Sequence, residues 1–235
     1  MAITTANPPS GASSGRFAKA YKGPPMEGFV ARWYARIRRP GDEIETVVRR
    51  VTNVAPPGSA VLEVAPGPGY LAVELARRGG YEVTGLDISR TFVALAREHA
   101  RAAGLEVRFE HGDASAMPFP REVFDFAVCC AAFKNFTHPV EAIAELHRVL
   151  KPGGSACIMD LRRNASAGEV DAYVRELGLS RFNAWVVKLT FRRFLLKNAY
   201  TPEEMSELVS RTPFRNCQLA VEGISQEVWL SKEQA

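Results

Sequence analysis

Apolar and polar residues alternate along the chain in blocks that predict a regular succession of strands and helices. Short apolar runs are typical of buried strands, whereas apolar residues repeated every three or four positions are typical of helices. The repeated order of strand and helix indicates a parallel sheet covered by helices on both faces. The predicted strands are 61–64, 81–86, 105–110, 124–130 and 155–160, and helices are predicted after residue 69, at 89–103 and at 139–150.

Several helix starts carry residues that cap the free backbone N–H groups of a first turn. Asp42 and Ser89 stand before helical segments as candidate N-caps. Thr201 is followed by Pro202 and, three residues on, by Glu204, which predicts a capping box. Two last apolar runs, about 214–221 and 225–230, flank a Glu-Gly pair and predict a C-terminal hairpin.

Residues 161–197 depart from the regular alternation. One amphipathic helix is predicted around 170–177, and the following stretch is strongly apolar, with aromatic residues that include Phe182, Trp185, Phe191 and Phe194. Core filling is the ordinary interpretation of any one of these residues. As a block inserted between sheet elements, the segment also fits a cap over a substrate pocket.

The N-terminal region divides into two parts. Residues 1–25 are rich in Ala, Ser, Gly, Pro and Thr, so we expect a flexible arm in which Phe17 and Tyr21 are the candidate anchors. Residues 26–39 then carry an apolar stripe at helical spacing, which Pro40 and Gly41 end.

Composition limits the class of protein. With 235 residues, 46% hydrophobic and 24% charged, the chain suffices for one generous domain, predicted here at 26–235. The net charge of +4 is spread over the chain, and basic clusters such as 36–39 and 192–197 are typical of solvated helix faces. No nucleic-acid motif accompanies them, so we expect no nucleic-acid partner.

The cysteines and histidines predict no metal centre. The four cysteines lack the spacing of zinc or redox sites and are interpreted as reduced thiols of a cytoplasmic protein. The sequence has no apolar stretch long enough to span a bilayer and no apolar signal core at its start.

The stretch VLEVAPGPGYLAVELA at 61–76 predicts a strand, a tight glycine turn and a helix. Glycines let backbone N–H groups approach a ligand, and the helix N-terminus adds partial positive charge, so the motif indicates a nucleotide-like cofactor. Gly67, Gly69 and Ala72 also have the G-x-G-x-x-A spacing of a dinucleotide-binding turn. Asp87 closes the next strand, where a carboxylate can accept both ribose hydroxyls, and it suits either cofactor.

Five stretches together resemble the class I S-adenosylmethionine-dependent methyltransferases over roughly 33–230. They are EVAPGPG, GLD, GDASAMPFP, FDFAVCCAAFKNF and ELHRVLKPGG. The resemblance implies an α/β, Rossmann-like fold with a seven-stranded, mostly parallel sheet, helices on both faces and an antiparallel C-terminal hairpin strand. It also implies S-adenosyl-L-methionine as cofactor and S-adenosyl-L-homocysteine as product.

Two details are similar to the ubiquinone and menaquinone biosynthesis C-methyltransferase branch, also described as methyltransferase type 11. One is the Phe-Lys-Asn-Phe stretch at 133–136, and the other is Ala-Arg-Trp-Tyr ending at Tyr34, which resembles a cofactor-covering helix. Ala65 stands where the family usually has glycine, and Ala35 where it has aspartate. The resemblance implies lid helices at 26–55 and a cap at 161–200.

The resemblance also assigns roles to residues of the cofactor site. The acidic residue and glycines of the first turn hold the methionine moiety, Asp87 holds the ribose, and the segment after the third strand binds adenine. A strand-end carboxylate and a core aliphatic remain alternative interpretations of the first acidic residue and of Ile88. The implied cofactor-binding residues are Tyr34, Glu63, Ala65, Gly67, Gly69, Asp87, Ile88, Asp113 and Ala114.

The function that these motifs predict is in-line methyl transfer to a small, apolar or aromatic acceptor. His138 is a candidate base because it follows the fourth strand, and Lys134, Asn135 and Trp185 are candidate acceptor contacts. Two alternatives are a non-catalytic S-adenosylmethionine-binding regulator and a nicotinamide-dependent oxidoreductase. The sequence predicts neither the methylated atom nor the oligomeric state.

Overall fold

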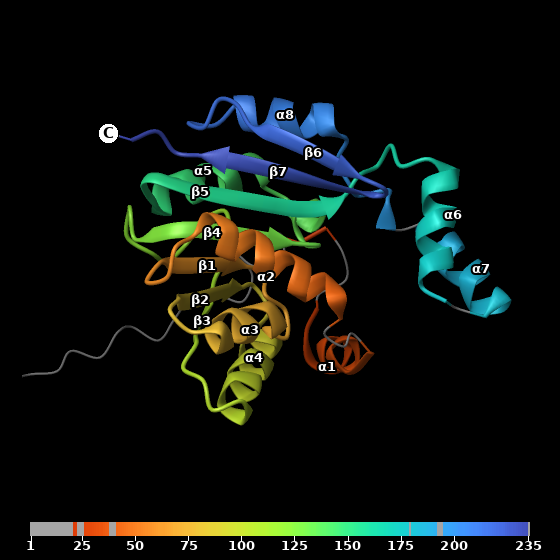
Figure 1. Cartoon of the computed structure of the whole chain (residues 1–235), viewed down its shortest axis with the longest axis horizontal. Helices are drawn as coiled ribbons and strands as arrows, with labels where there is room; N and C mark the ends of the chain where they lie inside the picture. Colours follow the sequence, from red (N-terminus) through yellow and green to blue (C-terminus); the bar gives the residue numbers. More distant parts are fainter. Residues whose placement is uncertain (1–20, 23–25, 38–40, 179, 192–194, 235) are drawn as a thin grey trace, which may run out of the picture.

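A computed structural model describes residues 21–22, 26–37, 41–178, 180–191 and 195–234 (Figure 1). Seven strands form one sheet in the order β3-β2-β1-β4-β5-β7-β6. The first five strands pair in parallel, whereas β7 is antiparallel to β5 and to β6. The predicted Rossmann-like sheet with its antiparallel C-terminal hairpin is therefore confirmed. The strands are β1 Ala60–Val64, β2 Glu82–Asp87, β3 Arg108–His111, β4 Phe124–Cys130, β5 Leu150–Leu161, β6 Gln218–Glu222 and β7 Ser225–Ser231.

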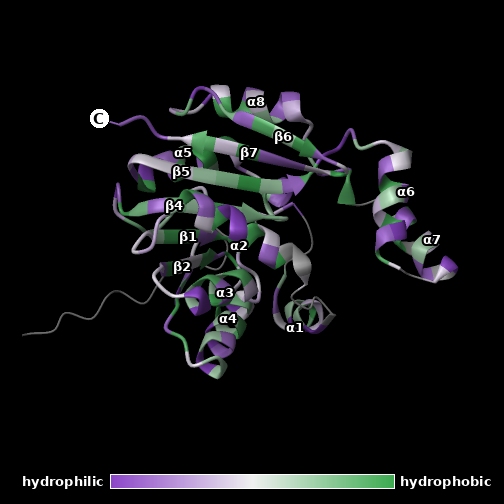
Figure 2. Ribbon diagram, in the orientation of Figure 1, coloured by the Kyte–Doolittle hydropathy of each residue, from purple (hydrophilic) through white to green (hydrophobic). Residues whose placement is uncertain are grey.

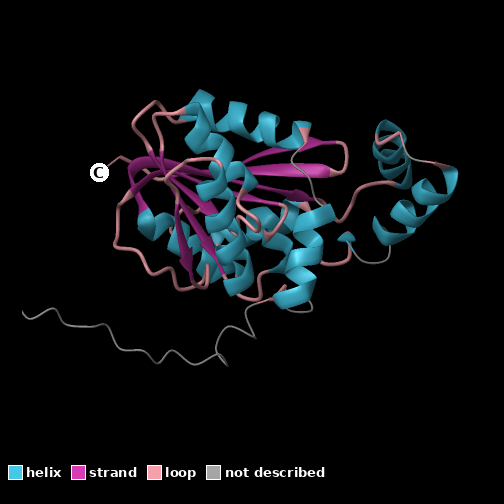
Figure 3. Cartoon of the chain, turned by 90° about the horizontal axis from the view of Figure 1, so that it is seen from below, coloured by secondary structure: helices cyan, strands magenta, loops and turns pink. Residues whose placement is uncertain are grey.

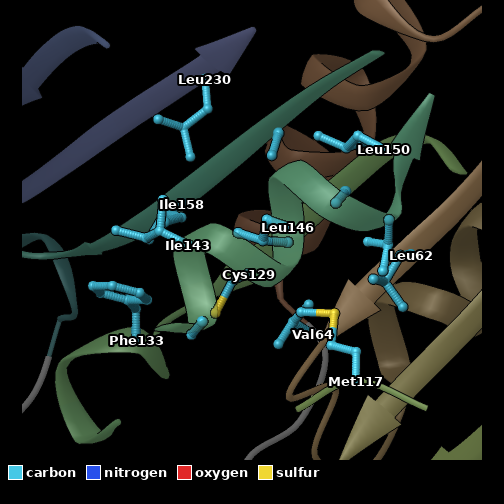
Figure 4. Close-up of a cluster of buried hydrophobic side chains, with 14 of the residues drawn as sticks. Leu62, Val64, Met117, Cys129, Phe133, Ile143, Leu146, Leu150, Ile158 and Leu230 are labelled. Carbon is cyan, nitrogen blue, oxygen red and sulfur yellow. The ribbon is translucent and has the colours of Figure 1, made fainter. Parts of the chain in front are cut away.

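Helices cover both faces of this sheet (Figure 3). On one face, helices α2, α3 and α4 pack against the strand residues Val61, Phe126 and Val128. On the other face, α5 and α8 pack against Leu62 and Ala127, which are the next residues in the same two strands (Figure 4). Adjacent strand residues thus face opposite cores, and hydrophobic residues recur along the central strands (Figure 2). The helices are α1 Gly28–Ile37, α2 Asp42–Val54, α3 Tyr70–Arg78, α4 Arg90–Ala102, α5 Pro139–Val149, α6 Ala167–Glu176, α7 Arg181–Thr190 and α8 Pro202–Ser210, with a short 3₁₀ turn, η2, at Phe133–Asn135.

Strand register brings the segments after the parallel strands to one edge of the sheet. Val64 of β1 lies beside Leu86 of β2, and Asp87 lies beside His111 of β3. The same edge, toward the right of Figure 1, carries the turn before α3 and the loop after β4. The candidate residues that the sequence places after separate strands are therefore neighbours in space.

The predicted N-cap residues are confirmed at two helices, and at a third helix the N-cap is one residue earlier than predicted. Ser89 accepts the N–H of Phe92 at the start of α4, and Thr201 with Glu204 forms a capping box on α8. At α2 the prediction is wrong by one residue, because Gly41 occupies the N-cap and Asp42 is already the first helical residue.

Three strand boundaries also differ from the prediction. β3 begins at Arg108 rather than 105, because Leu105 donates its N–H to Ala100 O and so closes the end of α4. β6 begins at Gln218 rather than about 214, since buried Phe214 packs edge-on against His147 instead of pairing with a strand. β5 begins at Leu150 rather than 155, because Gly153 and Gly154 near its start form backbone hydrogen bonds with Lys232, which follows β7.

The segment after β5 forms a helical hairpin that projects from the sheet edge (Figures 1 and 3). A small third core, which includes Val170, Val174, Leu196 and Ile224, joins it to the body. Buried Arg162 fastens its base: the guanidinium donates to Gly223 O at 2.8 Å and pairs with Glu169 on α6.

Parts of the predicted domain plan lie outside the described residues. Of the predicted arm at 1–25, the structure describes only Tyr21 and Lys22, and Phe17 lies outside the described residues. Phe194 of the predicted cap also lies outside them. No helix within the described ranges is long and apolar enough to cross a membrane.

Candidate active site

The turn after β1 adopts left-handed backbone at three positions, Ala65 (φ 57°), Gly67 (φ 55°) and Gly69 (φ 80°). Glycine adopts this conformation without steric cost, whereas alanine at position 65 tolerates it at some strain. At Gly69 space is also limiting, because a Cβ there would lie 2.7 Å from Cβ of Ala96 and 3.0 Å from the Phe109 ring. The turn can therefore pack closely against α4 and β3.

Gly69→Ala should lower the free energy of unfolding by about 2–4 kcal/mol, since it adds left-handed strain and overpacking. Gly67→Ala is the matched control, because it also has a positive φ but no heavy atom lies within 4 Å of the added Cβ. That variant should lose only about 1–2 kcal/mol. Urea unfolding of both variants measures the difference, and equal losses would show that the contact with α4 and β3 does not require glycine.

Asp87 organises the turn from the end of β2. Its Oδ2 accepts the N–H of Gly67 at 2.9 Å, and its Oδ1 accepts the N–H of Ser89 at 2.8 Å. Burial raises the pKa of the carboxyl to about 6, although these two N–H groups favour the ionised form. Each carboxylate oxygen retains a second lone pair, so the side chain can still accept hydroxyl donors from a ligand in the cleft.

Glu63 lies beneath the turn on β1 and is buried at the wall of the same cleft. Its Oε2 has no hydrogen-bond partner among the described residues. Burial, with a smaller contribution from the nearby carboxylate of Asp87, raises the pKa of this carboxyl to about 8. A buried acceptor without a donor is costly, so this atom fits a ligand that brings an N–H group, such as the amino group of a methionine moiety.

Binding of S-adenosylhomocysteine should release a proton from Glu63. The free carboxyl is mostly protonated at neutral pH because its pKa is about 8, and a cationic amino group favours the ionised form. Affinity should therefore rise as the pH increases from about 6.5 to 8. Calorimetry in buffers of different ionisation enthalpy measures the released proton.

Glu63→Gln is the control for this pH dependence. It should bind less tightly and with a flatter pH profile, and an unchanged profile would assign the proton to another group. Because the pKa of Glu63 rises from 4.5 to about 8 on folding, its burial destabilises the folded state increasingly as pH rises between those values. The glutamine variant should therefore be more stable than the parent above neutral pH.

Ile88, Asp113 and Ala114, which the resemblance assigns to adenine, all line the cleft. Asp113 Oδ1 accepts the backbone N–H and the hydroxyl of Ser115, both at 2.8 Å, which fixes the carboxylate at the cleft wall. His111 also lines the cleft, and its Nε2 contacts Ile88 O at 3.0 Å. These residues line the cleft together with the glycine turn.

Lys134 and Asp160 form a buried ion pair where β4 and β5 end. Lys134 Nζ donates to Asp160 Oδ1 at 2.8 Å and to Ala131 O at 2.6 Å, and its backbone N–H donates to Asp160 Oδ2. Both side chains line the cleft, so contact of Lys134 with an acceptor stays a prediction. In the free protein its ammonium group holds the loop after β4 to β5.

The other three candidate residues differ in their position relative to the cleft. Asn135 lines the cleft, and its carbonyl accepts the N–H of Lys22, so the described end of the N-terminal arm crosses this loop. His138 is exposed at the rim before α5, with Nδ1 3.1 Å from Thr137 Oγ1. Trp185 is 61% exposed on α7 and is not among the residues that line the cleft.

Helix α1 closes one side of the cleft. Tyr34 lines it and packs edge-on against Phe92, with ring centroids 5.9 Å apart. Glu27, just before α1, accepts the N–H groups of Arg90 and Thr91 and so caps α4. Sequence reasoning missed Glu27, since the pair is 63 residues apart and no local pattern signals it.

Two further cleft residues were not assigned a role from the sequence. Tyr21, proposed only as an anchor, lines the cleft, and burial raises the pKa of its hydroxyl, with smaller contributions from Tyr34 and Asp87. Gln226 of β7 donates Nε2 to Tyr200 O at 2.8 Å, while its buried Oε1 has no partner among the described residues. Both supply polar groups to an otherwise largely apolar wall.

The cleft is large enough for two ligands. Its volume is about 2270 Å³, above the roughly 300–1,000 Å³ of common ligand pockets. Within the described part of the chain, no group of three or more His, Cys, Asp or Glu side chains is placed to hold a metal ion. All four cysteines are free thiols, and burial raises the pKa of each.

Residues 61–154 match the family described as "Methyltransferase domain". The demethylmenaquinone methyltransferase of Thermus thermophilus is 44% identical over 101 residues, which cover 43% of this chain and 46% of that protein. The 2-phytyl-1,4-naphtoquinone methyltransferase of Synechococcus elongatus is 34% identical over 139 residues, covering 57% and 58%. The chain thus spans about half the length of the curated relatives it matches.

A solved structure shows the same fold over nearly the whole chain. The putative S-adenosyl-L-methionine-dependent methyltransferase from Methanococcus maripaludis has a TM-score of 0.70 at 16% sequence identity. The match covers 91% of this chain and 96% of that one. The elements outside the family match therefore also belong to this fold.

Proposed function

Because the chain carries a class I S-adenosyl-L-methionine-dependent methyltransferase domain, we propose that it transfers a methyl group to a largely apolar or aromatic small molecule. The family match also resolves the choice that the glycine turn left open, in favour of S-adenosylmethionine over a nicotinamide cofactor. The observation that carries the proposed cofactor site is the buried Glu63 Oε2, which has no hydrogen-bond partner in the described part of the chain and lies in the cleft that Asp87 also lines.

The proposed site divides the cofactor among three groups of residues. Glu63 and the turn from Ala65 to Gly69 hold the methionine moiety, and Asp87 accepts the ribose hydroxyls. Ile88, Asp113 and Ala114 enclose the adenine. The cofactor supplies an electrophilic methyl group on a sulfonium sulfur, and the protein's part is to hold the acceptor in line with it, an effect of up to roughly 7–11 kcal/mol.

The acceptor side of the cleft supports an apolar or aromatic substrate. Phe136, Leu161, Phe191, Leu195 and Ile224 line it. Gln226 also lines the cleft, and its buried Oε1, which has no hydrogen-bond partner among the described residues, can accept a hydroxyl of the acceptor. Two relatives are named for methylating demethylmenaquinone and 2-phytyl-1,4-naphtoquinone, and this supports a quinone-like ring as the acceptor.

Polar side chains that can contact or deprotonate the acceptor also line the cleft. His138 at the rim remains the proposed base, while Lys134 and Asn135 remain proposed acceptor contacts. Tyr34 and Tyr21 also line the cleft. Their proposed role, as part of the lid, is to exclude water from the cofactor.

The test is a panel of phenols, quinols, amines and carboxylates incubated with S-adenosylmethionine, with S-adenosylhomocysteine and the methylated product measured together. We expect equimolar product and S-adenosylhomocysteine from quinol-like or phenolic acceptors. Asp87→Ala is the negative control. Tight binding of S-adenosylhomocysteine with no turnover of any acceptor would instead support the non-catalytic regulator.

A further inference from the structure

Large apolar side chains are exposed on the two helical elements that flank the mouth of the cleft. On α1, Phe29 is 80% exposed and Trp33 is 54% exposed, with Val30 beside them. On the projecting hairpin, Trp185 of α7 is 61% exposed, and Leu189 and Leu177 are exposed as well. We call these six residues, together with the basic residues of α1 and α7, the mouth surface.

The exposed apolar side chains are concentrated at this place. Eight large hydrophobic residues are exposed in the described part of the chain, and six of them belong to α1 and the hairpin. The other two are Val221 on β6 and Val54 at the end of α2. Val54 leads into the start of β1 and so lies at the opposite edge of the sheet.

Both elements adjoin the same opening. Trp33 and Tyr34 of α1 line the cleft from one side, and Tyr173 of α6 and Phe191 after α7 line it from the other. Figures 1 and 3 show α1 and the hairpin at the sheet edge where the parallel strands end. An apolar phase that touches the mouth surface would therefore lie at the entrance of the acceptor cleft.

The two helices that carry most of the mouth surface, α1 and α7, are basic, whereas α6 beside α7 carries Glu169, Asp171 and Glu176. α1 carries Arg32 and Arg36, α7 carries Arg181 and Lys188, and neither helix contains an acidic residue. Three of these four are exposed, while Lys188 pairs with Asp171 of α6 at 2.9 Å. Exposed Trp, Phe and Leu combined with Arg and Lys are typical of helices that lie in the interface of an anionic bilayer.

We propose that the mouth surface docks the protein on an anionic lipid bilayer. The aromatic and aliphatic side chains enter the boundary between headgroups and acyl chains, and the arginines contact lipid phosphates. If two copies of the chain associated through this face, the positive charges of one copy would face those of the other, which disfavours self-association. Docking does not depend on methyl transfer, so the proposal stands apart from the catalytic one.

The test uses the full chain and vesicles of phosphatidylcholine alone or with one quarter phosphatidylglycerol. Co-sedimentation should show binding to the mixed vesicles, at least tenfold weaker on pure phosphatidylcholine and weakened by salt. Tryptophan fluorescence should shift to shorter wavelength on binding, because Trp33 and Trp185 leave water.

Two pairs of variants separate the apolar from the charged contribution. Phe29→Ser/Trp185→Ser should weaken vesicle binding roughly tenfold or more, whereas Val54→Ser should not. Arg32→Glu/Arg181→Glu should also weaken vesicle binding roughly tenfold or more. Its control is Arg101→Glu/Arg121→Glu, which makes the same change of charge at exposed positions elsewhere and should leave binding close to that of the parent. Circular dichroism verifies that every variant folds.

Three results would overturn the proposal. One is the absence of binding to anionic vesicles, and another is equal loss of binding in test and control variants. The third is a concentration-dependent dimer, measured by light scattering, that Phe29→Ser/Trp185→Ser converts to monomer, which would assign the surface to a second copy of the chain.

Discussion

Asp87→Ala should weaken the binding of S-adenosylhomocysteine at least a hundredfold. The carboxylate is proposed to accept two ribose hydroxyls, and hydrogen bonds to a charged group contribute roughly 1.5–3 kcal/mol each. The same side chain accepts the N–H groups of Gly67 and Ser89, so its loss also releases the glycine turn. Calorimetric titration of parent and variant measures the change.

Glu82→Ala is the matched control, because Glu82 is an exposed carboxylate at the other end of the same strand. It should leave the dissociation constant unchanged. Asp87→Asn should lie between the two, since an amide keeps one acceptor oxygen but loses the charge. Unaltered affinity in a folded Asp87→Ala protein would remove Asp87 from the cofactor site.

Lys134→Met should lower the free energy of unfolding by about 3–5 kcal/mol, because it leaves the buried carboxylate of Asp160 without its cation. The ammonium group also donates to Ala131 O, which belongs to the loop that lines the cleft. The loop after β4 should therefore lose order together with stability. Urea unfolding measures the stability, and hydrogen exchange at 131–135 measures the order of the loop.

The double variant Lys134→Met/Asp160→Asn separates a structural role from an acceptor-binding role. It removes both charges, while the amide oxygen of asparagine can still accept a backbone N–H of Lys134 or Leu161, so much of the stability should be restored. If Lys134 also contacts the acceptor, this stable double variant should retain cofactor affinity but show a raised KM. A single variant as stable as the parent would contradict the importance of the ion pair.

The sequence predicted those elements whose signals are local. β4 is observed at Phe124–Cys130 as predicted, because a strand buried on both faces is a continuous apolar run. The capping box at Thr201 and Glu204 is equally local, and the structure confirms it. The start of β3 was misjudged because Leu105 is apolar for a different reason, its position at the end of α4.

In the candidate site, too, the sequence predicted the contacts between residues of one motif but not the contacts between residues of separate strands. The glycine turn and Asp87 were recognised from residues close together in sequence, and their contact at 2.9 Å spans 20 positions of a common motif. Lys134 and Asp160 are 26 residues apart and meet through the pairing of β4 with β5, which no local pattern specifies. For Trp185, aromatic content alone did not show which side of the hairpin faces the cleft.

The most direct test of the proposed cofactor site is a crystal structure of the protein with S-adenosylhomocysteine. The ribose hydroxyls should lie within hydrogen-bond distance of the Asp87 carboxylate, the amino group should lie near Glu63 Oε2, and the adenine should lie between Ile88 and Asp113. A ligand bound elsewhere, or bound in the cleft without contacting Asp87 and Glu63, would contradict this account.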